Sequence, residues 1–426
     1  MHIIVIGAGL MGLTSAYFLR RHGADVTVIE AKDGPALDAS FGNGGYNQAT
    51  LPDPWNAPGV FGLFAKAWLA DLTSNAERSA FLTRTRAIPG LMRWGLQFLK
   101  YSNAETYLRH TELNARLAQY SLDVLDELDA AESLSYSRSD NGGLIIFRDR
   151  KSLQSYCDVA EQVCDADGAF VAMDRDQLLE KEPSLAEIAR ELSGAVFFPN
   201  DRSGNPHELG EQLAVSVERH GVCLRYGESV QRLAADDNSV TVTTDQGEVS
   251  ADYLLISAGA GSTALMRMLG ISLPVAPAKG YSITMPMGEW SNRPQHVIAD
   301  MGVHAGVNPM GDFLRVAGTA EFAGMRPGIS EERIGYLLNL TKQIFPSFSN
   351  SIDPANIEAW AGLRPLSSDG IPILGETPRQ RVYLNAGHGG LGWTQAAGSG
   401  KAVADYIVGA NNSFDISDFS IGRFSP

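Results

Sequence analysis

The sequence Gly7-Ala8-Gly9-Leu10-Met11-Gly12 decides how the rest of the chain is interpreted. An apolar run over residues 2–6 precedes these glycines, and residues 13–21 follow them with helical spacing. A strand, a tight turn and a helix in this order are typical of a dinucleotide site. Gly7 would make the turn, Gly9 would let the backbone approach a pyrophosphate, and Gly12 would let the helix pack closely on the strand. The N-terminus of the helix would hold the anion.

A second apolar run supports this interpretation. It covers residues 25–29 and ends at Glu30, roughly twenty residues past the glycines, where a carboxylate can accept hydrogen bonds from a ribose hydroxyl. A glycine motif alone is weak evidence, and a structural glycine-rich turn is the alternative. The strands on both sides and the acid at Glu30 favour a dinucleotide site.

Composition and charge exclude several classes of protein. The 426 residues suffice for two or three domains with substantial cores. The chain has 34 Lys and Arg against 49 Asp and Glu, a net charge of −15, so we expect no nucleic-acid partner. Cys157, Cys164 and Cys223 form no metal-binding pattern, and we expect no metal site. Such a sparse, odd set indicates free, buried thiols in a reducing compartment.

The first strand begins close to the N-terminus, without a basic segment and apolar core of the signal-peptide kind, and no apolar run approaches the ~18 residues needed to cross a bilayer. We therefore expect a cytoplasmic protein. Residues 58–72 carry several large apolar side chains and few charges. This segment could form a helix on the inner face of the cell membrane or against a partner subunit, or it could pack on its own domain.

Helical and strand patterns alternate along the remaining chain. We expect helices over residues 89–101, 106–131, 151–167, 174–181, 206–220, 330–344 and 396–408, and strands over 143–147, 222–226, 239–244, 253–256, 279–283, 297–298, 313–318 and 382–386. After residues 253–256 comes Ser257-Ala258-Gly259-Ala260-Gly261, which would bring the backbone to a ligand a second time or form a plain strand-to-helix turn. The strands of residues 271–350 suggest an antiparallel sheet.

The strand at residues 382–386 and the helix at residues 396–408 repeat the order of strand and helix at the start of the chain, so we expect both ends of the chain to contribute to one domain. The predicted fold is α/β, with a Rossmann-type FAD-binding domain formed by residues 1–85, 190–270 and 355–426. Residues 86–189 and 271–354 would form a discontinuous α+β substrate domain on an antiparallel sheet. An NAD dehydrogenase usually keeps its cofactor motifs within one continuous half of the chain, so the scattered arrangement favours FAD.

A family resemblance covers nearly the whole chain. The matching stretches are residues 7–12, Ser40-Phe41-Gly42-Asn43-Gly44-Gly45, Trp94-Gly95-Leu96-Gln97-Phe98-Leu99, residues 117–121, Pro199-Asn200-Asp201, Lys279-Gly280-Tyr281-Ser282, Gly362-Leu363-Arg364-Pro365 with Asp369-Gly370, and residues 387–400. With these motifs the chain resembles the FAD-dependent D-amino-acid oxidase superfamily, and within it the bacterial D-amino-acid dehydrogenases. The first motif is common to many flavoproteins, whereas the combination of the others is more specific.

The resemblance implies roles for particular residues. Arg364 stands where related oxidases bind the substrate carboxylate, a task suited to its bidentate fork, although a structural ion pair is the alternative. His388 could tune the flavin or relay protons, and Tyr281 could line the substrate pocket; either could instead be a packing residue. The residues implied to contact the flavin are Ser40, Asn43, Gly44 and Gly45 along the ring and Gly389, Gly390, Leu391, Gly392, Trp393 and Thr394 at its pyrimidine end.

The sequence also departs from the family pattern. Relatives that bind substrate through a tyrosine have no counterpart in residues 302–308, where His304 or Asn308 could substitute, so the side-chain specificity is open. Relatives with covalently held flavin use a cysteine near the Gly-Leu-Arg-Pro position. This chain has none there, so we expect non-covalent FAD.

The resemblance implies FAD-dependent oxidation of a D-amino acid to an imine, which hydrolyses to the 2-oxo acid and ammonia, with electrons passed to a quinone or respiratory acceptor. Three alternatives remain. The first is a related flavoenzyme acting on glycine, sarcosine, D-proline, hydroxyproline or an opine. The second is an FAD-bearing subunit of a larger dehydrogenase complex. The third is an NAD-binding protein.

Overall fold

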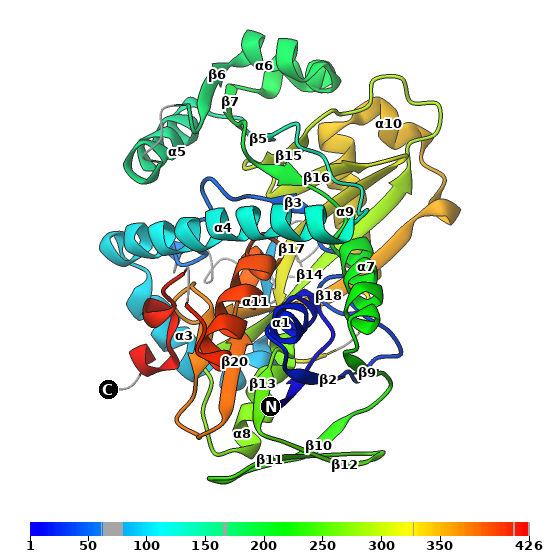
Figure 1. Cartoon of the computed structure of the whole chain (residues 1–426). Coiled ribbons are helices and arrows are strands. Elements are labelled where there is room, and N and C mark those ends of the chain that lie inside the picture. The colour runs from blue at the N-terminus through cyan, green and yellow to red at the C-terminus, as the bar shows by residue number, and fades with distance from the viewer. Residues whose placement is uncertain (61, 63–79, 165–167, 327, 412–413, 425–426) are drawn as a thin grey trace.

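The protein is described from a computed structural model, which covers residues 1–60, 62, 80–164, 168–326, 328–411 and 414–424 (Figure 1). Most of the apolar segment at residues 58–72 lies outside these described residues. Within them, no helix combines the length and the apolar character that a membrane crossing requires. The same residues contain no group of acidic, histidine and cysteine side chains suited to hold a metal ion.

A six-stranded sheet carries the glycine motif. Its order is β19 (Ile373–Glu376), β20 (Val382–Ala386), β13 (Tyr253–Ile256), β1 (His2–Ile6), β2 (Asp25–Ile29) and β9 (Cys223–Arg225). All neighbours are parallel except β19 and β20. Ile3 and Val5 of β1 lie in one hydrophobic core, and Ile4 and Ile6 lie in another. Because both faces of this sheet are covered, its central strand is a continuous apolar run.

Helices cover one face of this sheet. α1 (Leu10–Arg21) packs between α7 (Pro206–Arg219) and α11 (Gly392–Val408), and α4 (Ala104–Glu132) lies across α11 (Figure 1). The other face packs on α8 (Ser262–Met268) and on a three-stranded sheet of β10 (Val230–Ala235), β11 (Val240–Thr244) and β12 (Gly247–Ala251). Strands and helices from the first, middle and last parts of the chain thus contribute to one α/β unit.

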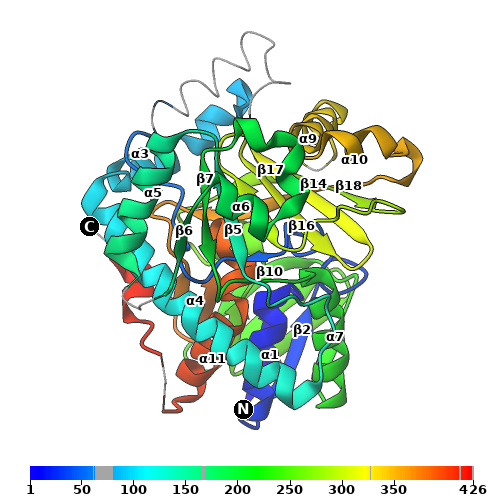
Figure 2. The same cartoon turned by 90° about the horizontal axis from the view of Figure 1, so that it is seen from above.

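A nine-stranded sheet lies on the other side of the molecule (Figure 2). Its order is β18 (Glu358–Ser367), β14 (Val275–Pro286), β17 (Phe313–Phe322), β16 (Ala305–Met310), β15 (Val297–Asp300), β5 (Gly143–Phe147), β7 (Gly194–Phe198) and β6 (Val171–Asp174), with β4 (Phe81–Thr83) paired to β17. The strands from β18 to β15 are antiparallel, as expected. The sheet as a whole is mixed, because β15 with β5 and β17 with β4 are parallel.

The remaining elements flank these sheets. The helices are α3 (Ile88–Tyr101), α5 (Arg150–Val163), α6 (Arg175–Lys181), α9 (Glu331–Ile344) and α10 (Pro346–Ser351), and β3 (Tyr46–Asn47) pairs with β8 (Arg202–Ser203). Short 3-10 helices are η2 (Thr85–Ala87), η3 (Pro183–Glu191), η4 (Gly259–Gly261), η5 (Pro354–Asn356), η6 (Gly389–Leu391), η7 (Ser417–Phe419) and η8 (Ile421–Phe424). α9 covers the face of the large sheet that faces away from the six-stranded sheet.

The division of the chain into domains stays a prediction, and the sheets suggest a different division at three places. β4, β7 and β18 pair within the nine-stranded sheet, whereas the expected boundaries assign their residues to the FAD-binding domain. We propose that all three strands belong to the substrate domain.

Two local expectations were wrong. α11 begins at Gly392, four residues before the expected start. The prediction began too late because the glycines in the early turns have a low helix propensity, but in the structure they allow close packing. Gly398 lies against the backbone of Ser121 in α4, which leaves no room for a side chain. Cys223 is exposed on the edge strand β9, whereas Cys157 is buried, so the thiols are not uniformly buried.

A buried carboxylate joins three helices of the first unit. Glu132, the last residue of α4, accepts hydrogen bonds from Tyr17 of α1 at 2.8 Å and from Ser216 of α7 at 2.7 Å. The ring of His220 lies 2.8 Å from the same carboxylate, and Arg219 also contacts it. Burial by itself would raise the pKa of Glu132, but these hydrogen bonds outweigh burial and lower the pKa to about 2.

We predict that Glu132→Gln lowers the free energy of unfolding at pH 7 by about 1–3 kcal/mol, because it removes a charged acceptor from buried donors. The pKa of Glu132 is lower in the folded protein than its ordinary 4.5, so the stabilisation is present above that pH and is lost as the pH falls toward 2. Urea denaturation should therefore show that the free energy of unfolding falls less between pH 7 and pH 3 in the variant than in the wild type. Glu112→Gln, at an exposed position of the same helix, is the control and should match the wild type.

Candidate functional site

The three glycines of the motif have different surroundings. Gly7 has a φ of +107°, and a Cβ there would lie 2.6 Å from the carbonyl oxygen of Ser257. A Cβ on Gly12 would overlap the carbonyl oxygen of Gly7. At Gly9 the nearest atom is 4.0 Å away, the hydroxyl of Ser40. Gly7 and Gly12 thus permit the turn and the helix contact, while Gly9 keeps space open in front of α1.

Glu30 lies at the carboxyl end of β2, beside the glycine turn. Its carboxylate accepts hydrogen bonds from two backbone N–H groups, that of Ala8 at 2.7 Å and that of Lys32 at 2.9 Å. The carboxyl ends of β1, β2 and β13 meet at this edge of the sheet. This is where an open parallel sheet binds its ligand.

A cavity of about 470 Å³ opens at this edge. It is lined by ten of the predicted cofactor residues: Gly7, Gly9, Glu30, Ser40, Asn43, Gly259, Gly389, Gly390, Gly392 and Trp393. Three buried polar atoms of its lining residues, Ser257 Oγ, Asn385 Oδ1 and Trp393 Nε1, have no hydrogen-bond partner among the described residues. Open backbone at a helix N-terminus, an acid and unsatisfied polar atoms fit a bound dinucleotide.

The other predicted cofactor residues lie elsewhere. Gly12 packs α1 on β1, and Gly45 is enclosed by Gly204 and Asn308. The remaining three, Gly44, Leu391 and Thr394, line a second cavity of about 340 Å³. Both cavities are lined by Ala39, Asn43, Arg364 and Gly390, so they adjoin.

Glycines in facing strands make room for Arg364 in the second cavity. Gly280 of β14 pairs with Gly362 of β18, and the guanidinium of Arg364 occupies the space that a Cβ on Gly280 would need. The ring of Trp360 covers Gly362 in the same way. Trp360, Gly362 and Arg364 alternate along β18, so they share the face that borders the cavity.

Arg364 has no ion-pair partner among the described residues. One guanidinium nitrogen donates to the carbonyl oxygen of Thr319 at 3.1 Å, and the group lies 5.6 Å from the ring centroid of Trp55. Burial lowers the pKa of Arg364 to about 10, so the side chain remains charged at neutral pH. Because a buried, unpaired guanidinium is costly, the cavity is suited to an anionic group.

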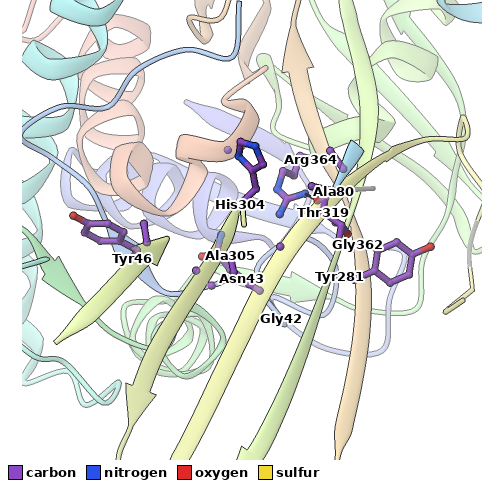
Figure 3. Close-up of a pocket in the computed structure, with 18 of the residues that line it drawn as sticks. Gly42, Asn43, Tyr46, Ala80, Tyr281, His304, Ala305, Thr319, Gly362 and Arg364 are labelled. Atoms are coloured by element: carbon purple, nitrogen blue, oxygen red, sulfur yellow. Dashed lines mark hydrogen bonds between the residues drawn. The ribbon is translucent and has the colours of Figure 1, made fainter. Parts of the chain in front are cut away.

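Tyr281 is among the residues that line this cavity, but its ring lies on the other face of β14, in the core arrangement that the sequence left open as the alternative. Gly280 faces Arg364, so Tyr281, the next residue in β14, points to the opposite face. There its hydroxyl donates to Glu321 at 2.6 Å, and its ring belongs to the core beneath α9. Figure 3 shows this ring pointing away from Arg364.

His388 lines the first cavity and not the second. It is buried, with one ring nitrogen 3.2 Å from the hydroxyl of Ser399 in α11. Burial lowers the pKa of His388 to about 3, so the ring is neutral at physiological pH. The structure therefore places His388 beside the cofactor residues in the first cavity, which Arg364 also lines, and not in the second cavity.

An aromatic wall, formed by Trp55, Phe81 and His304, borders the second cavity. Phe81 lies edge-on to Trp55 at 6.3 Å and to His304 at 5.4 Å between ring centroids. His304 has a φ of 54°, and burial lowers its pKa. Asn308, its expected alternative, donates instead to the carbonyl oxygen of Gly44 at 3.2 Å.

Sequence reasoning missed Trp55, Phe81 and Trp360. For Trp360 a signal existed, since residues two and four positions apart in a strand share a face with Arg364. Trp55 and Phe81 lie outside regular motifs, and their approach to the cavity depends on the tertiary structure.

Comparisons with known proteins identify the family of this chain. The family model described as DAO, FAD dependent oxidoreductase, matches residues 2–406. A protein of Methylobacterium nodulans named D-amino acid dehydrogenase is 35% identical over 426 residues, which cover 100% of this chain and 99% of the relative. A protein of the same name from Paramagnetospirillum magneticum is also 35% identical, over 100% of this chain and 99% of its own length.

Solved structures show the same fold. Glycine oxidase from Geobacillus kaustophilus superposes with a TM-score of 0.76 at 20% identity, over 99% of this chain and 98% of that protein. L-Proline dehydrogenase from P. horikoshii superposes with a TM-score of 0.76 at 18% identity, over 99% and 97% of the two chains. Since the family model spans nearly the whole sequence and the relatives align along their full length, this chain belongs to the DAO family of FAD-dependent oxidoreductases.

Proposed function

We propose that the protein oxidises a D-amino acid, with the substrate carboxylate bound by Arg364. The observation that carries the proposal is the partly buried guanidinium at the junction of the two cavities, which has no ion-pair partner among the described residues. The full-length relatives named D-amino acid dehydrogenase support the choice of substrate. In the reaction a hydride leaves Cα, the amine lone pair forms the C=N bond, and a proton leaves the nitrogen. Water then hydrolyses the imine to the 2-oxo acid and ammonia.

Bound FAD supplies the two-electron acceptor, and the residues of this chain position the substrate. Arg364 would hold the carboxylate by two parallel hydrogen bonds, which fixes the direction of Cα. The aromatic wall of Trp55, Phe81 and His304 would exclude water from the reacting atoms. No side chain need act as a base if the substrate amine binds in its neutral form.

The predicted cofactor residues would hold FAD along the first cavity. The carboxylate of Glu30 would accept a hydrogen bond from a ribose hydroxyl, and Gly9 would leave room for the pyrophosphate at the N-terminus of α1. The N-terminus of α11, with Gly389 and Gly390, would stabilise negative charge at the pyrimidine end of the ring. None of the three cysteines lines either cavity, which supports non-covalent binding.

We further propose that electrons leave to a quinone or another respiratory acceptor, and that the protein acts in the cytoplasm at the inner face of the membrane. The name of the full-length relatives, dehydrogenase, supports this acceptor class. Exposed Met92, Leu96 and Leu99 on α3 are consistent with peripheral contact with a membrane or a partner subunit.

The function is tested by adding D-amino acids, their L-enantiomers, glycine, sarcosine, D-proline, hydroxyproline and opines to the purified protein without oxygen. We expect D-amino acids to bleach the visible flavin absorbance, and a quinone to restore it faster than air does. Bleaching only by glycine, sarcosine or a cyclic amine would contradict the proposed substrate. A flavin reduced by none of these compounds, but reducible by dithionite, would favour a relay subunit of a larger complex.

We predict that Arg364→Ala lowers kcat/KM for D-amino acids by about 10²–10³-fold, because truncating one partner of a buried charge pair costs about 2–5 kcal/mol. Arg364→Lys should recover part of this loss, since lysine keeps the charge but not the bidentate fork. The measurement is anaerobic flavin reduction, normalised to bound FAD because Arg364 borders both cavities. Arg379→Ala, at an exposed position, is the control. Unchanged affinity and turnover in Arg364→Ala would refute the role of this residue.

We predict that Gly9→Val folds but loses FAD, because a Cβ at Gly9 would lie 4.0 Å from its nearest neighbour, the hydroxyl of Ser40, and Gly9 lines the cavity that FAD would occupy. Gly12→Val should instead destabilise the fold, since its Cβ would overlap the carbonyl of Gly7. Flavin absorbance per chain and circular dichroism separate the two effects. A Gly9→Val protein with full FAD content would be inconsistent with the assigned pyrophosphate position.

A further inference from the structure

A third cavity, of about 370 Å³, adjoins the pocket of Arg364. Trp55, Phe81 and Leu391 are among the residues that line both. The third cavity extends away from Arg364 toward Phe98 and Phe322, and most of its wall is apolar. Trp55 and Phe81 of the aromatic wall separate this third cavity from Arg364, so the side chain of a substrate bound at Arg364 could extend past them into it.

One carboxylate interrupts the apolar wall. Asp53, in the proline-rich segment before the aromatic Trp55, is the only acidic residue among the described residues that line this chamber. It accepts a hydrogen bond from the hydroxyl of Tyr107 at 3.1 Å, and no described cation forms an ion pair with it. Burial raises the pKa of Asp53 to about 6, so the group is mostly ionised at neutral pH.

The two adjoining cavities therefore hold opposite charges, each hydrogen-bonded once to the protein but without an ion-pair partner among the described residues. Arg364 has no acidic partner in the second cavity, and Asp53 has no basic partner in the third, among the described residues. Each of these partly buried charges is disfavoured by its partial removal from water unless a ligand pairs with it. A ligand with a carboxylate at one end, an aliphatic stem and a cation at the other end would satisfy both charges, and its stem would contact the apolar wall.

We propose that the third cavity is a side-chain subsite for D-amino acids with a cationic end, an ammonium or a guanidinium, which pairs with Asp53. This inference rests on the proposed function, because it assumes that the substrate carboxylate is bound by Arg364. Tyr107 is then a positioning residue that orients the carboxylate of Asp53 through its hydroxyl.

The test compares kcat/KM for D-lysine and D-arginine with that for D-norleucine, which has the stem of lysine without its charge. In the wild type we expect the cationic substrates to exceed D-norleucine by about tenfold or more. Asp53→Asn should lower kcat/KM for the cationic substrates by about 10–100-fold, as for a hydrogen bond to a charged group. The same variant should change kcat/KM for D-norleucine by less than about threefold. Asp123→Asn, at an exposed position of α4, is the matched control.

Each result is decisive. An equal loss for all three substrates in Asp53→Asn would place Asp53 at the shared α-amino group and overturn the side-chain subsite. A wild type that prefers D-norleucine would overturn it without any variant, so the proposal remains testable even if Asp53→Asn does not fold. Failure of the wild type to oxidise any D-amino acid would instead refute the proposed function.

Discussion

The close contact between α1 and the turn after β1 is the constraint on which the site depends. A Cβ on Gly12 would overlap the carbonyl of Gly7, and Gly7 itself lies against Ser257 after β13. Two strands and a helix therefore converge with no side chains between them. This convergence keeps the N-terminus of α1 at the edge of the sheet, and the open position at Gly9 becomes part of a cavity and not of a core.

The second cavity also depends on glycines that allow close packing, here in the nine-stranded sheet. Gly280 of β14 pairs with Gly362 of β18. The guanidinium of Arg364 occupies the space that a Cβ on Gly280 would need, and the ring of Trp360 occupies the space over Gly362. A charged side chain thus lies against backbone and Trp55, and within the described part of the chain no acid neutralises it. This charge without an ion-pair partner destabilises the folded protein, and it lies where the carboxylate of a substrate can pair with it.

Local patterns predicted what depends on short segments. The glycine motif, Glu30 and the alternation of strands and helices follow from residues that are neighbours in the chain, and Arg364 followed from a family motif. The orientation of Tyr281 could not be predicted, because β14 is buried on both faces and shows no alternation of polar and apolar residues. The third cavity was also beyond prediction, since Asp53, Phe98, Phe322 and Leu391 come from four distant parts of the chain with no common period.

The order of strands in the six-stranded sheet has a consequence for synthesis on the ribosome. β1 pairs with β13, some 250 positions later, and β13 pairs in turn with β20, which ends at Ala386. At about 5–20 residues per second, β1 and β2 wait roughly 20–80 s before their sheet is complete. During this time two apolar strands are without their final neighbours, so the nascent chain depends on whatever protects such strands from aggregation.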